Sequence, residues 1–236
     1  MHRTDHFGTA HVPESRFGKW FLRSDVWARY VLRDAVDALA DLIPSPQPAY
    51  GVILDAGCGI GHAFLFLEAA FAPDRIVGVD IDRAMLQVAS RRAAARRIDF
   101  DSHAESLSAM SVPSESVDLV FCHQTFHHVV DQVAALREFR RVLRPNGVLL
   151  FAESTRRYIS SWLIRLLFRH PMEVQRTASE YEAMLRAAGF VIAPNAISHP
   201  YLWWSRPDFG IGEYWLGRRP DEPCEPTLIY AAAVRM

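Results

Sequence analysis

The chain has 236 residues, half of them hydrophobic, and a formal net charge of −1 at pH 7. This length suits one domain with a substantial core, and the balanced charge lacks the basic footprint that bulk nucleic-acid binding usually shows. The three cysteines form neither a Cys-x-x-Cys pair nor a zinc-ligand spacing, so neither a disulfide framework nor a metal site is indicated.

Short apolar runs alternate along the chain with longer helical stretches. Ser24 can cap a helix over 24–43, which a proline-rich segment ends. The further elements expected, in chain order, are strand 52–55, helix 62–71, strand 76–80, helix 83–97, strands 98–101 and 117–122, helix 130–143, strand 148–152, helices 158–169 and 178–188, and strands 190–197 and 228–234. This alternation predicts an α/β fold with a doubly wound, mostly parallel sheet that helices cover on both faces.

Three glycines occupy alternate positions, 57, 59 and 61, directly after the first of these strands. In a doubly wound sheet a ligand binds outside the carboxyl ends of the strands, and glycine allows a tight turn that the ligand can approach closely. The spacing departs from the dinucleotide fingerprint, because His62 stands where that motif has its third glycine. Asp80 ends the second strand, at about the right distance to hold ribose hydroxyls.

Four segments resemble, in order and spacing, the motifs of the class I S-adenosylmethionine-dependent methyltransferases, especially their small-molecule group. They are LDAGCGIG (54–61), VGVDID (77–82), DLVFCHQTFHHV (118–129) and FRRVLRPNGVLLFAE (139–153). The resemblance covers nearly half of the chain and implies S-adenosylmethionine as the cofactor. It also implies a Rossmann-like, seven-stranded sheet whose last strand is antiparallel, but it does not specify the methyl acceptor.

The resemblance assigns cofactor contacts to the first two motifs. Asp55 would orient the glycine loop or the amino group of the cofactor. Gly57 and Gly59 would lie against the amino-acid portion of the cofactor. Asp80 would accept hydrogen bonds from both ribose hydroxyls, and Ile81 would pack on adenine.

Further cofactor contacts are implied after the third and fourth strands and in the first helix. His103 stands where the family often has an Asp that holds the adenine amino group, so the backbone of Ala104 or the side chain of Glu105 is the alternative contact. His123 would offer its backbone to the methionine part of the cofactor, unless it is a histidine at the edge of the core. Trp27 or Tyr30 would lie near the methionine end.

The candidate catalytic residues follow the fourth and fifth strands. An oxygen acceptor needs a base near pH 7, and histidine is the natural proton acceptor. His127 and His128 stand where the acceptor should meet the cofactor, and His127 is favoured slightly; the alternative is that the pair only shapes the site. Glu153 is a second candidate, as base or as a group that orients the acceptor, with a solvated strand end as its alternative.

The chain is expected to form a single methyltransferase domain in three parts. These are an N-terminal helical flap (1–48), a cofactor-binding half (49–153) and an acceptor-pocket half (154–236). The apolar stripe on helix 158–169 suits core packing, a lid, a dimer face or a membrane surface. Several aromatic residues between 201 and 215, with Arg206, Arg218 and Arg219, would make an apolar pocket with an anchor for an anion.

These observations predict methyl transfer to a small, apolar or aromatic molecule, with oxygen as the favoured acceptor atom and nitrogen or carbon left open. A lipid or quinone-type acceptor at a membrane surface is the nearest variant. A nicotinamide-dependent oxidoreductase and a non-catalytic, cofactor-binding regulatory module are the alternatives from other classes. We expect a cytoplasmic protein, because no signal-peptide core or membrane-spanning apolar run is present. We also expect a monomer or homodimer, and the balanced charge predicts that it binds no nucleic acid.

Overall fold

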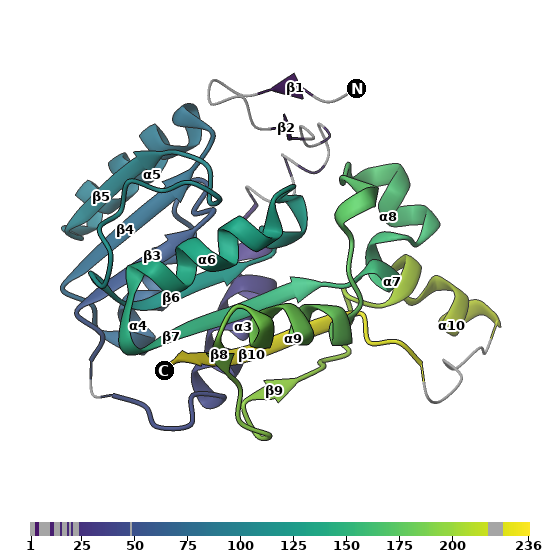
Figure 1. The fold of residues 1–236 in the computed structure, drawn as a ribbon. Helices are drawn as coiled ribbons and strands as arrows, with labels where there is room; N and C mark the ends of the chain where they lie inside the picture. Colours follow the sequence, from purple (N-terminus) through teal and green to yellow (C-terminus); the bar gives the residue numbers. More distant parts are fainter. Residues whose placement is uncertain are drawn as a thin grey trace.

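A twisted β-sheet forms the centre of this computed structural model, and helices pack on both of its faces (Figure 1). The structure describes residues 3–4, 10–11, 15, 18, 20, 24–47, 49–216 and 224–236. The strands of the central sheet are β3 (Val52–Ala56), β4 (Arg75–Asp80), β5 (Phe100–Ala104), β6 (Val117–His123), β7 (Leu143–Ser154), β8 (Phe190–Val191), β9 (Ile197–Ser198) and β10 (Leu228–Arg235). Two further short strands, β1 (Arg3–Thr4) and β2 (Ala10–His11), pair with each other.

The strand order is β5-β4-β3-β6-β7-β10-β8. The first strand of this sheet along the chain, β3, therefore lies in the interior of the sheet. The first five strands in this order are parallel, whereas β10 runs antiparallel to β7, and β9 also pairs with β10. The order reverses between β3 and β6, because the chain adds β4 and β5 on one side of β3 and then β6 and β7 on the other. Ligands of open α/β sheets bind at such a switch point, outside the carboxyl ends of the strands.

The helices include two segments that depart from α-helical geometry near the site, the π-helix η1 (Ala28–Leu32) and the 3₁₀ turn η2 (Phe126–His128). The others are α2 (Asp25–Trp27), α3 (Arg33–Asp41), α4 (Phe64–Phe71), α5 (Arg83–Arg96), α6 (Gln132–Val142), α7 (Arg156–Ile159), α8 (Trp162–Leu167), α9 (Ala178–Ala187) and α10 (Ile211–Leu216), with 3₁₀ turns η3 (Met172–Val174) and η4 (Pro207–Gly210). Figure 1 shows α6 and α9 across one face of the sheet and α3 on the other, while α7, α8 and α10 lie beyond the carboxyl end of β7. Among the described residues, no helix is both long and apolar enough to cross a membrane.

Local side-chain chemistry explains where several helices begin. The Asp82 carboxylate accepts hydrogen bonds from the backbone N–H groups of Ala84 and Met85 and so caps α5. Thr177 and Glu180 form a reciprocal capping box at the start of α9. These caps satisfy N–H groups that the first turn of a helix leaves without partners.

The predicted architecture is confirmed: a mostly parallel, Rossmann-like sheet with helices on both faces and an antiparallel final strand. The expected elements from residue 24 to residue 152 are present, with ends that differ by a few residues. Residues 144–147 of β7 interrupt its pairing with β6, and Asn146 has a φ of +65° there. The division of the chain into a flap and two halves stays a prediction.

Two predicted elements are wrong in extent. The single helix expected over 158–169 is two short helices, because Ser161 adopts an extended conformation between them. The single strand expected over 190–197 is the pair β8 and β9. Pro194, which has no N–H, lies in a turn closed by the hydrogen bond from Ala196 N to Ala193 O, so the sheet has eight strands instead of seven.

Candidate active site

The turn after β3, residues 57–61, is called here the glycine turn. The backbone N–H groups of Gly57 and Cys58 both donate to the carbonyl of Val79, which joins the turn to the end of β4. Gly57 has a φ of +78°, and a Cβ on it would lie 2.2 Å from Thr125 Cγ2. A Cβ on Gly59, which has a φ of +54°, would meet nothing nearer than Met85 Sδ at 3.9 Å. Gly57 therefore permits close packing on the loop after β6, whereas Gly59 presents bare backbone to open space.

The carboxylate of Asp80 lies at the carboxyl end of β4, beside the glycine turn. One oxygen accepts the N–H of Gly59 at 2.9 Å, and the other accepts the N–H of Asp82 at 2.8 Å. Burial raises the pKa of Asp80, although these backbone hydrogen bonds act in the opposite direction. Each oxygen has a second lone pair for an external hydroxyl group, so the carboxylate can hold a vicinal diol such as a ribose.

Asp55, at the end of β3, is a buried carboxyl with an unpartnered oxygen. Its side chain is almost fully inaccessible, and Oδ2 makes no hydrogen bond to the described residues. Burial, with a further contribution from the charge of Asp80, raises the pKa of Asp55 to about 8. A ligand ammonium group would pair with this oxygen and relieve both effects. The orphaned carboxyl oxygen and the open face of Gly59 together fit the amino-acid end of S-adenosylmethionine.

The predicted adenine contacts lie at the ends of β4 and β5. Ile81 exposes 39% of its surface, which leaves an apolar face for a flat ring. The imidazole of His103 is held by Asp101 at 3.1 Å and by Ser111 at 3.1 Å. Glu105 accepts the N–H of Ser111 at 2.6 Å. Both nitrogens of His103 are therefore already engaged, and the alternative contact through Ala104 or Glu105 stays a prediction.

His123, the last residue of β6, packs against Trp27 of α2. Its ring centroid lies 5.7 Å from that of Trp27, and the Trp27 ring also contacts Trp204 at 5.9 Å. Burial and the neighbouring His127 lower the pKa of His123 to about 3, and its buried Nε2 has no described partner. Tyr30 is 58% exposed, so of the two predicted aromatic residues Trp27 is the one that lies beside His123.

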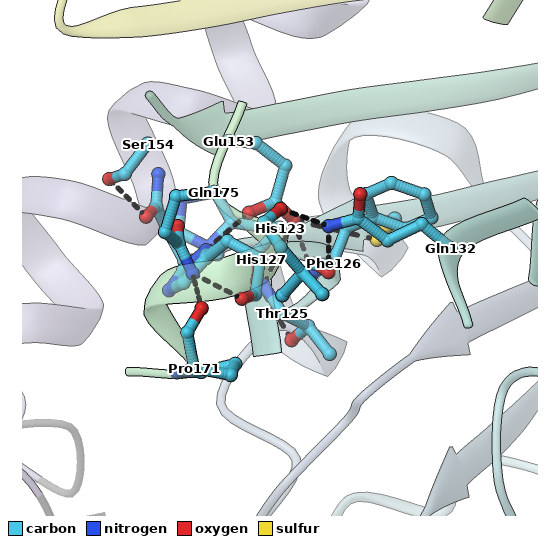
Figure 2. Close-up of polar contacts among 12 residues, drawn as sticks. His123, Thr125, Phe126, His127, Gln132, Glu153, Ser154, Pro171 and Gln175 are labelled. Atoms are coloured by element: carbon cyan, nitrogen blue, oxygen red, sulfur yellow. Dashed lines mark hydrogen bonds and ion pairs between the residues drawn. The ribbon is translucent and has the colours of Figure 1, made fainter. Parts of the chain in front are cut away.

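Glu153, at the end of β7, organises the loop that follows β6 (Figure 2). Its Oε1 accepts the backbone N–H groups of Thr125 at 2.9 Å and Phe126 at 2.7 Å, and lies 3.7 Å from Cys122 Sγ. Its Oε2 lies 2.6 Å from Nδ1 of His127. The side chain is fully buried, so the solvated strand end considered for Glu153 is wrong. This geometry favours a positioning role over direct contact with an acceptor.

Two buried amide side chains join the same loop to the segment before α9. Gln175 Nε2 donates to the carbonyls of His127 at 2.9 Å and Pro171 at 2.7 Å. Gln132 Nε2 donates to the carbonyls of Phe126 at 3.3 Å and Val174 at 3.0 Å. Figure 2 shows both amides directed at the loop after β6. Neither glutamine was predicted, because a buried amide carries no signature that distinguishes it from a surface one.

These contacts bring together three imidazoles, His127, His128 and His170, which we call the histidine cluster. His127 is buried, while the other two are partly exposed. Burial, together with the neighbouring imidazoles, lowers the pKa of His128, and burial with His127 lowers that of His170 to about 3. The sequence identified the first two residues but not His170, since a lone histidine before a proline has no recognisable pattern.

Two features predicted for the acceptor-pocket half are the arginine anchor and the apolar stripe of residues 158–169. Arg206 lies over the ring of Tyr201 at 5.4 Å and pairs with Glu213 at 3.3 Å, so its charge is already compensated. Arg218 and Arg219 lie outside the described residues. On the predicted apolar stripe, Ile159 is buried, whereas Trp162 and Leu166 are 62% and 70% exposed. The stripe therefore does not form one buried helical face.

Comparisons with known proteins agree with this geometry. Residues 54–151 match the family model described as a methyltransferase domain. A malonyl-[acyl-carrier protein] O-methyltransferase of Methylovorus sp. is 30% identical over 130 residues, which are 53% of this chain and 44% of that protein. A probable S-adenosylmethionine-dependent methyltransferase of Mycolicibacterium smegmatis is 35% identical over 142 residues, 59% of this chain and 52% of that one.

A solved S-adenosylmethionine-dependent methyltransferase of Aquifex aeolicus superposes with a TM-score of 0.65 at 15% identity. The superposition covers 94% of this chain and all of the other, which supports the fold. The chain spans about half the length of the two curated relatives described above. Residues 54–151, which contain the glycine turn and Asp80, are thus similar to a methyltransferase domain, and the sheet around them has the fold of the S-adenosylmethionine-dependent methyltransferases.

Proposed function

We propose that this chain transfers a methyl group from S-adenosylmethionine to an oxygen atom of a small, apolar or aromatic molecule. The observation that carries the proposal is the pairing of His127 with a fully buried carboxylate. Because Nδ1 of His127 lies 2.6 Å from Glu153, that nitrogen holds the proton of the neutral ring, and Nε2 is the basic atom. This arrangement suits a group that must accept a proton from an alcohol or phenol.

The residues around the glycine turn would hold the cofactor. Asp80 would bind the ribose hydroxyls, Asp55 the ammonium group, and Ile81 the adenine ring. When bound, S-adenosylmethionine supplies a methyl group already activated by the sulfonium. The remaining task of the protein is to align the acceptor with that methyl group, exclude water and receive the acceptor proton at Nε2 of His127.

The acceptor would approach from the histidine cluster. The loop that bears His127 and His128 packs on the glycine turn, since Thr125 fills the space that a Cβ on Gly57 would need. This contact supports an acceptor that sits between the cofactor and the imidazoles. An apolar acceptor also suits Trp27 and Trp204, whose rings pack together beside His123. Nitrogen and carbon acceptors remain open, because the same imidazole can serve more than one nucleophile.

Calorimetry with S-adenosylhomocysteine, run beside NADH, tests the cofactor assignment. The homocysteine compound should bind the wild-type chain, whereas Asp80→Asn should weaken binding by about 1.5–3 kcal/mol, as expected for lost hydrogen bonds to a charged group. Asp41→Asn, which removes an exposed carboxylate distant in sequence from the site, is the matched control. Binding of NADH without the homocysteine compound would favour an oxidoreductase and reject the proposal.

An acceptor screen then separates an enzyme from a regulatory module. Alcohols and phenols of increasing apolar area should include at least one that is methylated, and His127→Ala should lower kcat for it by about 10²–10⁴-fold, the usual contribution of a general base. Cofactor binding by His127→Ala should stay near the wild-type value. Binding without turnover on any acceptor would instead favour the non-catalytic module.

A lipid or quinone-type acceptor is a second candidate, favoured by the surface of α8. Trp162 and Leu166 are exposed one helical turn apart, and Arg165 and Arg169 on the same segment are also exposed. Such a combination suits the surface of an anionic membrane. Co-sedimentation with anionic vesicles should fall in the double variant Trp162→Glu, Leu166→Glu, while Val133→Glu, at an exposed position of α6, should have no effect. Absence of vesicle binding by the wild-type chain would remove this candidate.

A further inference from the structure

The histidine cluster has the form of an incomplete metal centre. The ring centroids of His127 and His128 lie 4.3 Å apart, and that of His170 lies 5.2 Å and 5.0 Å from them. One ring nitrogen from each residue can be chosen so that all three lie within 4.8 Å of one another. The three imidazoles come from two segments separated in sequence, the turn η2 and the stretch between α8 and η3.

We propose that His127, His128 and His170 form a binding site for one divalent transition-metal ion, such as Zn²⁺ or Co²⁺. Imidazole is a preferred ligand of such ions, and three histidines with a fourth, open position are typical of catalytic zinc sites. The proposal concerns the ion alone, so it does not depend on which molecule is methylated.

The surroundings of His127 match those of a metal ligand. A ligating histidine commonly directs its other nitrogen at a carboxylate, which fixes the orientation of the ring and makes it a better ligand. Glu153 provides this contact at 2.6 Å, leaving Nε2 of His127 for the ion. The carboxylate is itself fixed by the N–H groups of Thr125 and Phe126, so the ring is held from behind.

The position of His170 is also fixed by contacts outside the cluster. Gln175 bridges the carbonyls of His127 and Pro171, the residue that follows His170. Gln132 adds a bridge from Phe126 to Val174. These four hydrogen bonds place the backbone of the two histidine-bearing segments side by side. Among the described residues, neither His128 nor His170 makes a hydrogen bond through its ring, so both rings have free lone pairs.

The cluster must contract to hold an ion. Nitrogen ligands about 2.0–2.1 Å from a tetrahedral ion lie roughly 3.3 Å from one another. His170 lies outside any helix or strand, and we expect its segment to move toward the other two rings when an ion binds. The partial exposure of His128 and His170 leaves a path for the ion and for a fourth ligand. An ion at Nε2 of His127 would occupy the atom proposed as proton acceptor, so the two roles of that residue exclude each other at any one time.

Titration of the untagged, metal-free chain with Co²⁺ tests the proposal, because tetrahedral Co²⁺ absorbs visible light. The parent protein of this experiment carries His2→Ala, His6→Ala and His11→Ala, so that no ion is held by the N-terminal segment, and every variant is made in this parent. The chain should bind one Co²⁺, and Zn²⁺ should displace it. His170→Ala should weaken binding at least about tenfold. His199→Ala, which removes an exposed histidine outside the cluster, is the matched control and should bind as the parent does.

Two results would overturn the proposal: no stoichiometric Co²⁺ binding by the parent, or unchanged affinity in His170→Ala. Thermal unfolding must show that this variant folds; if it does not, His128→Asn replaces it in the same comparison. Zn²⁺ should also raise the unfolding temperature of the parent and of His199→Ala, but not of His170→Ala. Binding of S-adenosylhomocysteine is measured on the same samples. A chain that binds this compound but no ion rejects the metal site and leaves the proposed function standing.

Discussion

The environment of Asp55 opposes the usual charge of its side chain. Burial and Asp80 raise its pKa from 3.8 to about 8, so between these values the folded chain holds a proton that the unfolded chain releases. The free energy of unfolding therefore falls as the pH rises through this window. Asp55→Asn removes the effect, and its stability relative to wild type should increase from pH 5 to pH 8, by at most about 1.4 kcal/mol per pH unit.

Urea unfolding of the ligand-free proteins at pH 5, 6.5 and 8 measures this difference. Asp41→Asn serves as the control, because it removes an exposed carboxylate of the same charge. With saturating S-adenosylhomocysteine the pH dependence of the wild-type chain should flatten, since the ligand ammonium would favour the ionised form of Asp55. A difference between Asp55→Asn and wild type that stays constant with pH would contradict the assignment.

At the scale of elements, Glu153 joins the end of β7 to the loop after β6. Glu153→Ala would leave the N–H groups of Thr125 and Phe126 and the His127 ring without their buried acceptor. Leaving buried hydrogen-bond donors without an acceptor in this way typically costs about 1–3 kcal/mol. We expect a loss of this size in the free energy of unfolding, measured with urea.

The control for this loss is Glu182→Ala, which removes a partly exposed carboxylate paired with Arg186 at 2.8 Å one helical turn away. It should cost no more than about 1 kcal/mol. Glu153→Gln should fall between the two, because its amide oxygen can still accept the backbone N–H groups. Equal stability of Glu153→Ala and Glu182→Ala would show that the buried contacts do not stabilise the loop.

The two sides of the site differ in how far the sequence predicts them. The cofactor side depends on two short motifs at the ends of β3 and β4. One contains Asp55, Gly57 and Gly59, and the other contains Asp80, so local sequence spacing is enough to predict their positions. The contacts on the acceptor side join residues from β7, α6 and the segment before α9. Gln175 and His170 reach the loop after β6 only through tertiary packing, which leaves no pattern in either local sequence. Glu153 was recognised as important, but its burial depends on neighbours that lie far away along the chain.

At the scale of the whole molecule, the last strand occupies an internal position. β10 pairs with β7 over seven residue positions, from Leu228 opposite Ser154 to Val234 opposite Val148. Its other edge pairs with β8 and β9. The side chains from Leu228 to Ala233 are at most 1% exposed. The three consecutive alanines of β10 are small, which allows close packing on both faces of the sheet.

Removal of β10 should therefore abolish cooperative folding. A chain that ends at Thr227 loses its central antiparallel strand, leaves one edge of β7 unpaired and exposes the apolar faces of α3 and α9 that contact β10. The free energy lost with the burial of these six side chains is comparable with the whole free energy of unfolding of a domain, which is roughly 5–15 kcal/mol. The truncated chain should show neither a cooperative urea transition nor binding of S-adenosylhomocysteine. Deletion of the exposed Met236 alone should preserve both. If the chain ending at Thr227 still unfolds cooperatively, β7 must find another partner, and the C-terminal strand would be an addition to the cofactor-binding core instead of a part of it.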